Sequence, residues 1–139
     1  TPSTAAYDPK KAGIHPIVIK TDSNQVEDWN TNLPAAWRPS HVSQVELVVM
    51  LNFINNQIDV KRYIVRHSGN GSFFVRSYRV DMEVILLEAR TGRKIGYTLF
   101  QGGEPPTLID HLPAGTTALY GTTVAYETLQ LWLKSFVEK

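Results

Sequence analysis

The chain has 139 residues, the size of one ordinary domain, and its 42% apolar and 19% charged residues exclude a disordered or collagen-like protein. Fourteen basic and thirteen acidic residues give a net charge of +1, so the composition as a whole carries no excess of positive charge for a polyanion. Zero cysteines exclude a thiolate nucleophile, a cysteine-ligated zinc and an iron–sulfur cluster, and no apolar run approaches the roughly 18 residues of a membrane span.

The N-terminal segment has the composition of a linker. Residues 1–12 contain two prolines and mostly small or polar side chains, with no apolar period, which is typical of a flexible tether. We therefore expect a linker over 1–12 and a single α+β domain over 13–139. The chain does not begin with methionine, and two interpretations stay open: a cloning boundary, or a signal peptide, anchor or further domain ahead of Thr1.

The first structured elements are expected to be short. Ile14–Thr21 predicts a strand that lies at an edge or begins after Pro16, because proline has no N–H to donate. Residues 22–32 are polar and turn-rich around Trp29. Leu33–Ser43 contains two further prolines, so it holds at most short helical turns.

Alternation of apolar and polar residues predicts the central sheet. Asn55-Asn56 is expected to end one strand, and Arg90–Arg93 to form a tight turn between two others. The resulting four segments predict an antiparallel meander. They are Val45–Phe53, Ile58–Arg66, Ser72–Glu88 and Lys94–Phe100.

The C-terminal part combines a long connection with one helix. Residues 101–121 show no period and are rich in proline and glycine, so they are either functional or cross the sheet. From Thr123 an apolar stripe at helical spacing predicts a helix, which needs a sheet face to cover. The even-numbered face of Ser72–Glu88 is the natural candidate. The expected fold is α+β: a four- to five-stranded, mainly antiparallel sheet covered on one face by a C-terminal helix.

Signatures of catalysis are absent from the sequence. There is no nucleophile elbow, no zinc-protease motif and no P-loop, and the four histidines show no metal-ligand spacing. Asp110-His111 and the loop carboxylates Asp28 and Glu104 are the remaining candidates, and charged loop residues are usually solvated. We therefore predict no catalytic residue, no cofactor and no metal, and a protein that is not an enzyme.

Charge is distributed unevenly along the chain. Residues 61–94 hold eight basic and three acidic residues, a net of +5, whereas residues 21–60 have a net of −4. Arginine among aromatic residues on a sheet suits a protein contact or a single-stranded nucleic-acid platform. The order of elements differs from the RNA-recognition fold, so a nucleic-acid partner is an alternative and not the favoured interpretation. The candidate interaction surface consists of Arg62, Arg66, Arg76, Arg79, Trp29 and Trp37.

The two tryptophans in this set have two readings. Each could be an exposed interface anchor or could plug the end of the sheet, and burial is favoured because tryptophan covers a large apolar area.

The function that fits these observations is a non-enzymatic protein-interaction or accessory module with a protein partner still to be identified. Two alternatives stay open: a small-molecule or anion-binding domain with a pocket between helix and sheet, and nucleic-acid binding through the basic β-hairpin. An edge strand could also pair two copies into a homo-oligomer.

Several short segments carry a family resemblance. They are Leu33-Pro34, Trp37-Arg38, Val45–Val49, Tyr78–Val84, Glu88–Ile95, Gly102–Pro106 and Trp132–Val137. With them, residues 33–139 resemble a small domain of uncharacterised bacterial proteins that often follows a membrane anchor or signal peptide, or ends a multidomain chain. The resemblance implies the α+β architecture and an extracytoplasmic or membrane-tethered location. The family has no assigned activity, so it supplies no functional residue.

Overall fold

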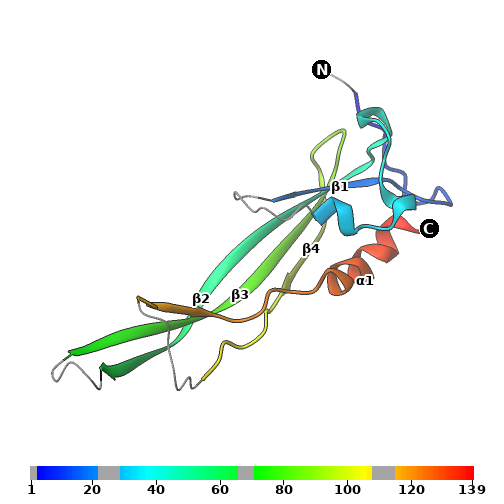
Figure 1. Cartoon of the computed structure of the whole chain (residues 1–139). Helices are drawn as coiled ribbons and strands as arrows, with labels where there is room; N and C mark the ends of the chain where they lie inside the picture. Colours follow the sequence, from blue (N-terminus) through cyan, green and yellow to red (C-terminus); the bar gives the residue numbers. More distant parts are fainter. Residues whose placement is uncertain (1–2, 22–28, 66–70, 108–114) are drawn as a thin grey trace. The chain divides into compact units, whose positions relative to one another are not determined.

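The computed structural model describes residues 3–21, 29–65, 71–107 and 115–139, and it shows the predicted α+β fold (Figure 1). Within these residues, three short 3-10 turns precede the long strands: Trp29–Asn32, Ala35–Trp37 and Val42–Gln44. The strands are β1 (Ile17–Thr21), β2 (Leu47–Val65), β3 (Gly71–Glu88), β4 (Lys94–Phe100) and β5 (Ala118–Tyr120). One helix, α1 (Tyr126–Val137), follows the last strand.

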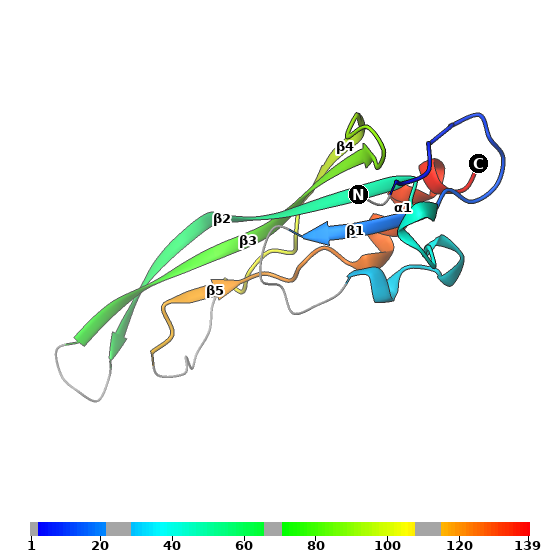
Figure 2. The ribbon, with the colours of Figure 1, turned by 90° about the horizontal axis from the view of Figure 1, so that it is seen from above.

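The sheet is mainly antiparallel, as predicted. Its order is β1-β2-β3-β4, with β5 pairing β3, and β2, β3 and β4 run in alternating directions. The parallel pairs are short: β1 lies beside β2 from Leu47 to Leu51, and β5 lies beside β3 from Arg76 to Tyr78 (Figure 2). The β3–β4 turn closes at Gly92, whose positive φ of 73° is readily adopted by glycine.

Strand β2 is longer than the sequence predicts. Asn55-Asn56 does not end it, because the strand continues without interruption from Leu47 to Val65. Cross-strand hydrogen bonds accommodate polar residues within it. Asn56 Nδ2 donates to Asp81 Oδ2 at 2.5 Å, and Asn52 Nδ2 donates to Glu83 Oε1 at 2.9 Å. The expected separate strands over Val45–Phe53 and Ile58–Arg66 are therefore one strand, with Arg66 itself outside the described residues.

The chain divides into two compact units. The first contains Thr1–Asn52, Glu83–Phe100 and Ala125–Lys139, and the second contains Phe53–Met82 and Gln101–Val124. Both β2 and β3 contribute residues to each unit.

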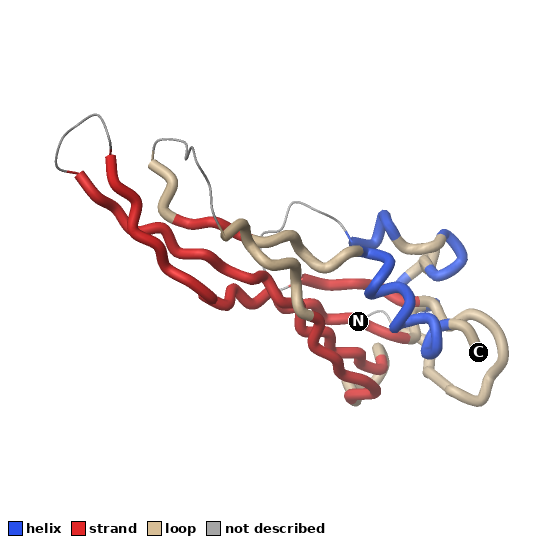
Figure 3. The backbone as a smooth tube through the Cα atoms, turned by 90° about the horizontal axis from the view of Figure 1, so that it is seen from below, coloured by secondary structure: helices blue, strands red, loops and turns tan. Residues whose placement is uncertain are grey.

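The first unit is built around the N-terminal part of the sheet and helix α1. Alternate residues of β1 and β2 are buried, as are Val84 and Leu86 of β3. Helix α1 contributes Leu129, Leu133 and Val137, spaced four residues apart on one face. Figure 3 shows α1 together with the three 3-10 turns of this unit. The helix begins at Tyr126, three residues after the predicted start at Thr123.

Two aromatic residues of α1 lie over strand β4. Trp132 and Phe136 pack against each other with ring centroids 5.1 Å apart, and both are only partly buried. A Cβ placed on Gly96 of β4 would lie 3.1 Å from Phe136 and 3.3 Å from Trp132. Glycine at this position therefore lets the rings approach the strand closely.

Residues 3–12 belong to the first unit and are not the predicted linker. The Ala5 amide donates to the Val45 carbonyl at 3.0 Å, and the buried Tyr7 donates its hydroxyl to the Phe136 carbonyl at 3.2 Å. The Tyr7 ring also meets the His15 ring edge-on, with centroids 5.0 Å apart. Composition alone suggested a tether, but the apolar surface of one tyrosine and these backbone contacts hold the segment in place.

A buried polar pair joins this segment to the sheet. Nδ1 of His15 lies 2.9 Å from Oε1 of Glu46, and Nε2 lies 2.8 Å from the Lys11 carbonyl oxygen. Both side chains are buried. Both ring nitrogens of this buried imidazole therefore lie within hydrogen-bond distance of an oxygen, one from the sheet and one from the N-terminal segment.

The second unit is held together by backbone contacts of its long connection. The Gly103 amide donates to the Thr122 carbonyl and the Gly121 amide to the Tyr78 carbonyl, each at 2.9 Å. A Cβ on Gly102 would overlap the Val80 carbonyl oxygen, and one on Gly121 would overlap that of Gly103. The glycines of the connection thus allow its two arms and β3 to approach closely. The described part of residues 101–121 therefore includes ordered backbone pairing and strand β5, which the sequence does not predict.

The buried stripe of α1 should dominate the stability of the first unit. Leu133 is completely buried, so Leu133→Ala should lower the free energy of unfolding by about 3 kcal/mol through lost burial and the cavity left behind. Leu131→Ala is the matched control, because Leu131 is 76% exposed and should change stability by less than about 0.5 kcal/mol. Urea unfolding of both variants measures the difference, and equal losses would contradict the assigned helix face.

Deleting residues 1–12 should destabilise the protein. The deletion removes the buried Tyr7 ring and the Lys11 carbonyl that His15 contacts. We expect a loss of at least about 2 kcal/mol, seen as a fall of about 5 °C in melting temperature. Tyr7→Ala in the full chain should reproduce most of this fall and Lys10→Ala, at an exposed position, none of it. An unchanged melting temperature on deletion would restore the linker interpretation.

Candidate functional site

The predicted surface arginines differ in their surroundings. Arg62 on β2 and Arg76 on β3 are exposed, and neither forms an ion pair with any described residue. Arg79 instead donates from Nε and Nη2 to the carboxylate of Asp81, at 2.8 and 3.0 Å. Arg66 lies outside the described residues. Two of the four arginines therefore carry free charge on the surface of the second unit.

Trp29 and Trp37 are core residues of the first unit, which confirms the favoured reading of burial and removes both from the candidate interaction surface. Both are buried. The Trp29 ring packs edge-on against Tyr126 with centroids 4.4 Å apart, and Trp37 Nε1 donates to Glu138 Oε1 at 3.1 Å. The 3-10 turns that carry these residues lie against α1, so the large apolar rings are used for packing.

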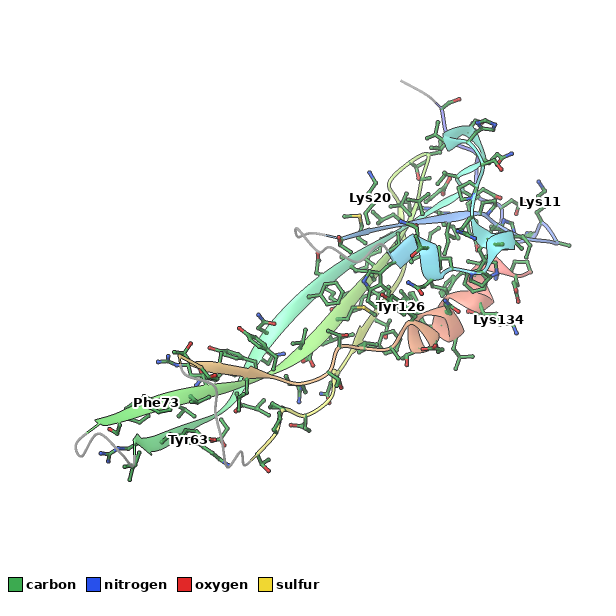
Figure 4. All side chains as sticks on the ribbon, viewed as in Figure 1. Lys11, Lys20, Tyr63, Phe73, Tyr126 and Lys134 are labelled. Atoms are coloured by element: carbon green, nitrogen blue, oxygen red, sulfur yellow. The ribbon has the colours of Figure 1, made fainter. Side chains whose placement is uncertain are left out.

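A stacked pair of aromatic rings indicates which residues share a face of the hairpin formed by β2 and β3. Tyr63 and Phe73 stack with centroids 5.7 Å apart and an interplanar angle of 19° (Figure 4). Because side chains alternate along a strand, the following residues, Ile64 and Phe74, point to the opposite face. Ile64 is 73% exposed and Phe74 is 60% exposed. Two large apolar side chains of this hairpin are thus exposed to solvent.

Strand β5 extends this surface with a second aromatic pair. Tyr120 is paired with Tyr78 in the β3–β5 register, and their rings stack with centroids 5.3 Å apart. Tyr78 lies on the same face of β3 as Phe74 and Arg76, because the three alternate. Tyr120 remains 55% exposed.

These side chains form one surface, which we call the hairpin face. Its members are apolar, aromatic or cationic, and all come from the second unit. They are Arg62, Ile64, Phe74, Arg76, Tyr78 and Tyr120. The even-numbered face of β3 was expected to lie under the helix throughout. This holds for the buried Val84 and Leu86 and is wrong at Phe74, whose side chain is exposed.

The buried carboxylate of Asp81 binds several segments next to the hairpin face. Asp81 accepts hydrogen bonds from Arg79, from Asn56 and, at 3.1 Å, from the backbone amide of Gly102. The Arg79 hydrogen bond is the main cause that holds the pKa of Asp81 below its usual value, against the opposing effect of burial. The same pairing raises the pKa of Arg79. Asp81 thereby pairs the charge of Arg79 and binds the backbone of the chain that follows β4.

The sequence indicates only some of the residues of the hairpin face. Basic charge in the sequence indicates Arg62 and Arg76, and both side chains are exposed in the structure. Tyr120 was missed because a three-residue strand is too short to show an apolar period. The sequence places Phe74 on the face expected to lie under the helix. Alternation shows which residues of β3 share a face, but it does not show how far along the strand the helix covers that face.

The loop residues weighed for catalysis are mostly beyond what the structure describes. Asp28, Asp110 and His111 lie outside the described residues. Glu104 is exposed, and its Oε1 lies 4.0 Å from Nη1 of Arg79. Among the residues with described positions, no three histidine, aspartate or glutamate side chains gather as a metal site would require.

One groove is seen on the first unit. It is open and lies on the outer side of α1, where Leu131 and Lys134 face Pro34 and Trp37. It therefore does not correspond to the pocket between helix and sheet that the small-molecule alternative requires. No helix in the described parts of the chain has the length and apolar character needed to cross a membrane.

Comparison with protein-family models found no match to this chain, and comparisons with curated proteins and with solved structures found none either.

Replacing Asp81 should destabilise the second unit in a pH-dependent way. A carboxyl group whose pKa is lowered by folding stabilises the protein above its ordinary pKa, near about 4, and this contribution is lost as pH falls toward the lowered value. Asp81→Asn should therefore cost about 2 kcal/mol at pH 7 and distinctly less at pH 3. Chemical denaturation at the two pH values measures this. Glu104→Gln, at an exposed carboxylate, is the control, and an equal cost of Asp81→Asn at both pH values would contradict the ionic role.

Proposed function

We propose that this protein is a non-enzymatic protein-interaction module and that the hairpin face is its contact surface. The observation that carries the proposal is the exposure of Phe74 and Tyr120 beside the unpaired cations Arg62 and Arg76.

The composition of the hairpin face suits a protein interface. Aromatic residues and arginine supply most of the binding energy in such interfaces, because they bury large areas and make several directed contacts. Strand pairing holds Phe74, Tyr78 and Tyr120 on a framework of β3 and β5, which limits the entropy lost on binding. The matching partner presents apolar side chains together with carboxylates that pair with Arg62 and Arg76.

The proposal favours a protein over a nucleic acid as partner. A single-stranded platform stacks bases on open aromatic faces. Here two ring pairs stack on each other, Tyr63 with Phe73 and Tyr78 with Tyr120, so each of these rings already has one face in contact with another ring. Phe74 and Ile64 present side chains that suit apolar protein contact.

The proposed setting of this module is outside the cytoplasm, as an anchored or linked part of a larger assembly. The support is the resemblance of residues 33–139 to a domain that often follows an anchor or signal peptide. Protease accessibility of the protein on intact source cells tests this setting.

The hairpin face is tested by comparing two double variants of the immobilised chain. Phe74→Ser/Tyr120→Ser removes apolar groups from the hairpin face, whereas Leu99→Ser/Leu131→Ser removes exposed apolar groups from the first unit. A protein retained from source-cell extract is identified, purified and titrated against each variant. We expect the first variant to lose at least about tenfold in affinity and the second to bind as the unchanged chain does.

Three results would contradict the proposal. One is a retained protein that binds both variants equally, and another is the absence of any retained protein. The third is salt-dependent binding of single-stranded oligonucleotides that Phe74→Ser/Tyr120→Ser abolishes, which would favour the nucleic-acid alternative.

A further inference from the structure

Strand β2 has an edge that is only partly covered. Strand β1 pairs with it from Leu47 to Leu51. Among the strands of the described residues, none pairs with this edge beyond Leu51, although β2 continues to Val65. The stretch of residues 54–65 lies within the second unit. We call it the free edge.

The free edge has properties that favour strand pairing. It contains no proline or glycine, and it exposes Ile58 and Val60, which are 43% and 47% accessible to solvent. An uncovered edge presents backbone donors and acceptors in a row, so proteins usually cover it, shorten it or protect it with charge. Lys61 and Arg62 supply charge here, but their effect depends on what lies opposite them.

The charges near the middle of the free edge are arranged so that they can pair with the same charges of a second copy. Asp59 is exposed, and its carboxylate accepts a hydrogen bond from the adjacent Val60 amide at 2.8 Å. Neither Asp59 nor Lys61 forms an ion pair with another residue in the described parts of the chain. The two opposite charges flank Val60 symmetrically, so a two-fold rotation about Val60 brings each opposite the other.

We propose that two copies of this chain pair antiparallel along the free edge, with Val60 on the two-fold axis. In this register Asp59 lies opposite Lys61 of the partner subunit, and Lys61 lies opposite the partner's Asp59. On the other face Val60 meets the partner's Val60, and Ile58 lies opposite the partner's Arg62, whose aliphatic stem can cover it.

Charge selects this register over its neighbours. In a two-fold symmetric antiparallel pair, one residue lies on the axis opposite its own copy. The neighbouring symmetric registers place the preceding or the following residue on the axis. With Asp59 on the axis the two aspartates oppose each other, and with Lys61 on the axis the two lysines do. Both arrangements place like charges face to face, which is destabilising, whereas the Val60 register gains two pairs of opposite sign.

Self-association through the free edge is independent of the proposed partner contact at the hairpin face. The two surfaces use different side chains apart from Arg62. The variant Phe74→Ser/Tyr120→Ser should therefore leave self-association unchanged, so failure of one proposal does not decide the other.

Charge exchange on the full chain tests the pairing. Sedimentation equilibrium from about 1 μM to about 1 mM should show a monomer–dimer equilibrium. Asp59→Lys or Lys61→Asp alone should weaken dimerisation at least about tenfold, because each creates two like-charge pairs. The double variant Asp59→Lys/Lys61→Asp restores the opposite-charge pairs and should return the dissociation constant to within about threefold of the original. Thermal unfolding verifies that each variant folds.

The absence of native cysteine allows the register to be tested directly. Under mild oxidation, Val60→Cys should form an intermolecular disulfide, because directly opposed Cβ atoms lie about 5 Å apart. Ile58→Cys is the matched control. In the proposed register the two Ile58 positions are four residues apart along the strands, about 13 Å, and should not cross-link.

The proposal is overturned by a monomer across the concentration range or by a dimer unaffected by charge reversal. Cross-linking of Ile58→Cys in preference to Val60→Cys would also overturn it, because that result places a different residue on the axis.

Discussion

The arrangement of the second unit depends on one buried carboxylate, that of Asp81. It collects the Arg79 guanidinium, the Asn56 amide and the backbone amide of Gly102 from three different segments. A buried charge without such partners would be costly, so the three segments are held where they can reach it. The chain after β4 is thereby fixed against β3, and its returning arm, which bonds Gly103 and Tyr78, carries Tyr120 onto Tyr78.

The first unit is organised by apolar burial with one polar exception. Leu129, Leu133 and Val137 supply the helical side of its core, while the pair of His15 and Glu46 lies among apolar groups. That pair needs the Lys11 carbonyl as well as the sheet, so the N-terminal segment completes the hydrogen bonds of the core. The N-terminal segment is thus needed because the buried imidazole of His15 requires a second hydrogen-bond partner. The composition of the segment gives no indication of this role, because the requirement comes from another residue.

The features predictable from the sequence were those encoded by neighbouring residues. Alternation located β3, β4 and the first half of β2, and helical spacing located α1 to within three residues. Non-local partners account for the failures: Asp81 accommodates Asn56 within β2, and Val45 and Phe136 bind residues 3–12. The hairpin face was half predictable for the same reason. Its arginines follow from local charge, but Tyr120 comes from a short strand defined only by its pairing with β3.

The positions of the tryptophans give the two units different optical properties. Trp29, Trp37 and Trp132 are the chain's three tryptophans, and all belong to the first unit. The six tyrosines are divided equally, and the second unit carries Tyr63, Tyr78 and Tyr120. Tryptophan emission therefore follows the first unit alone, while tyrosine absorbance includes the second. Melting curves recorded with the two signals coincide if the units unfold together and separate if they do not, so the native sequence contains its own probe of cooperativity.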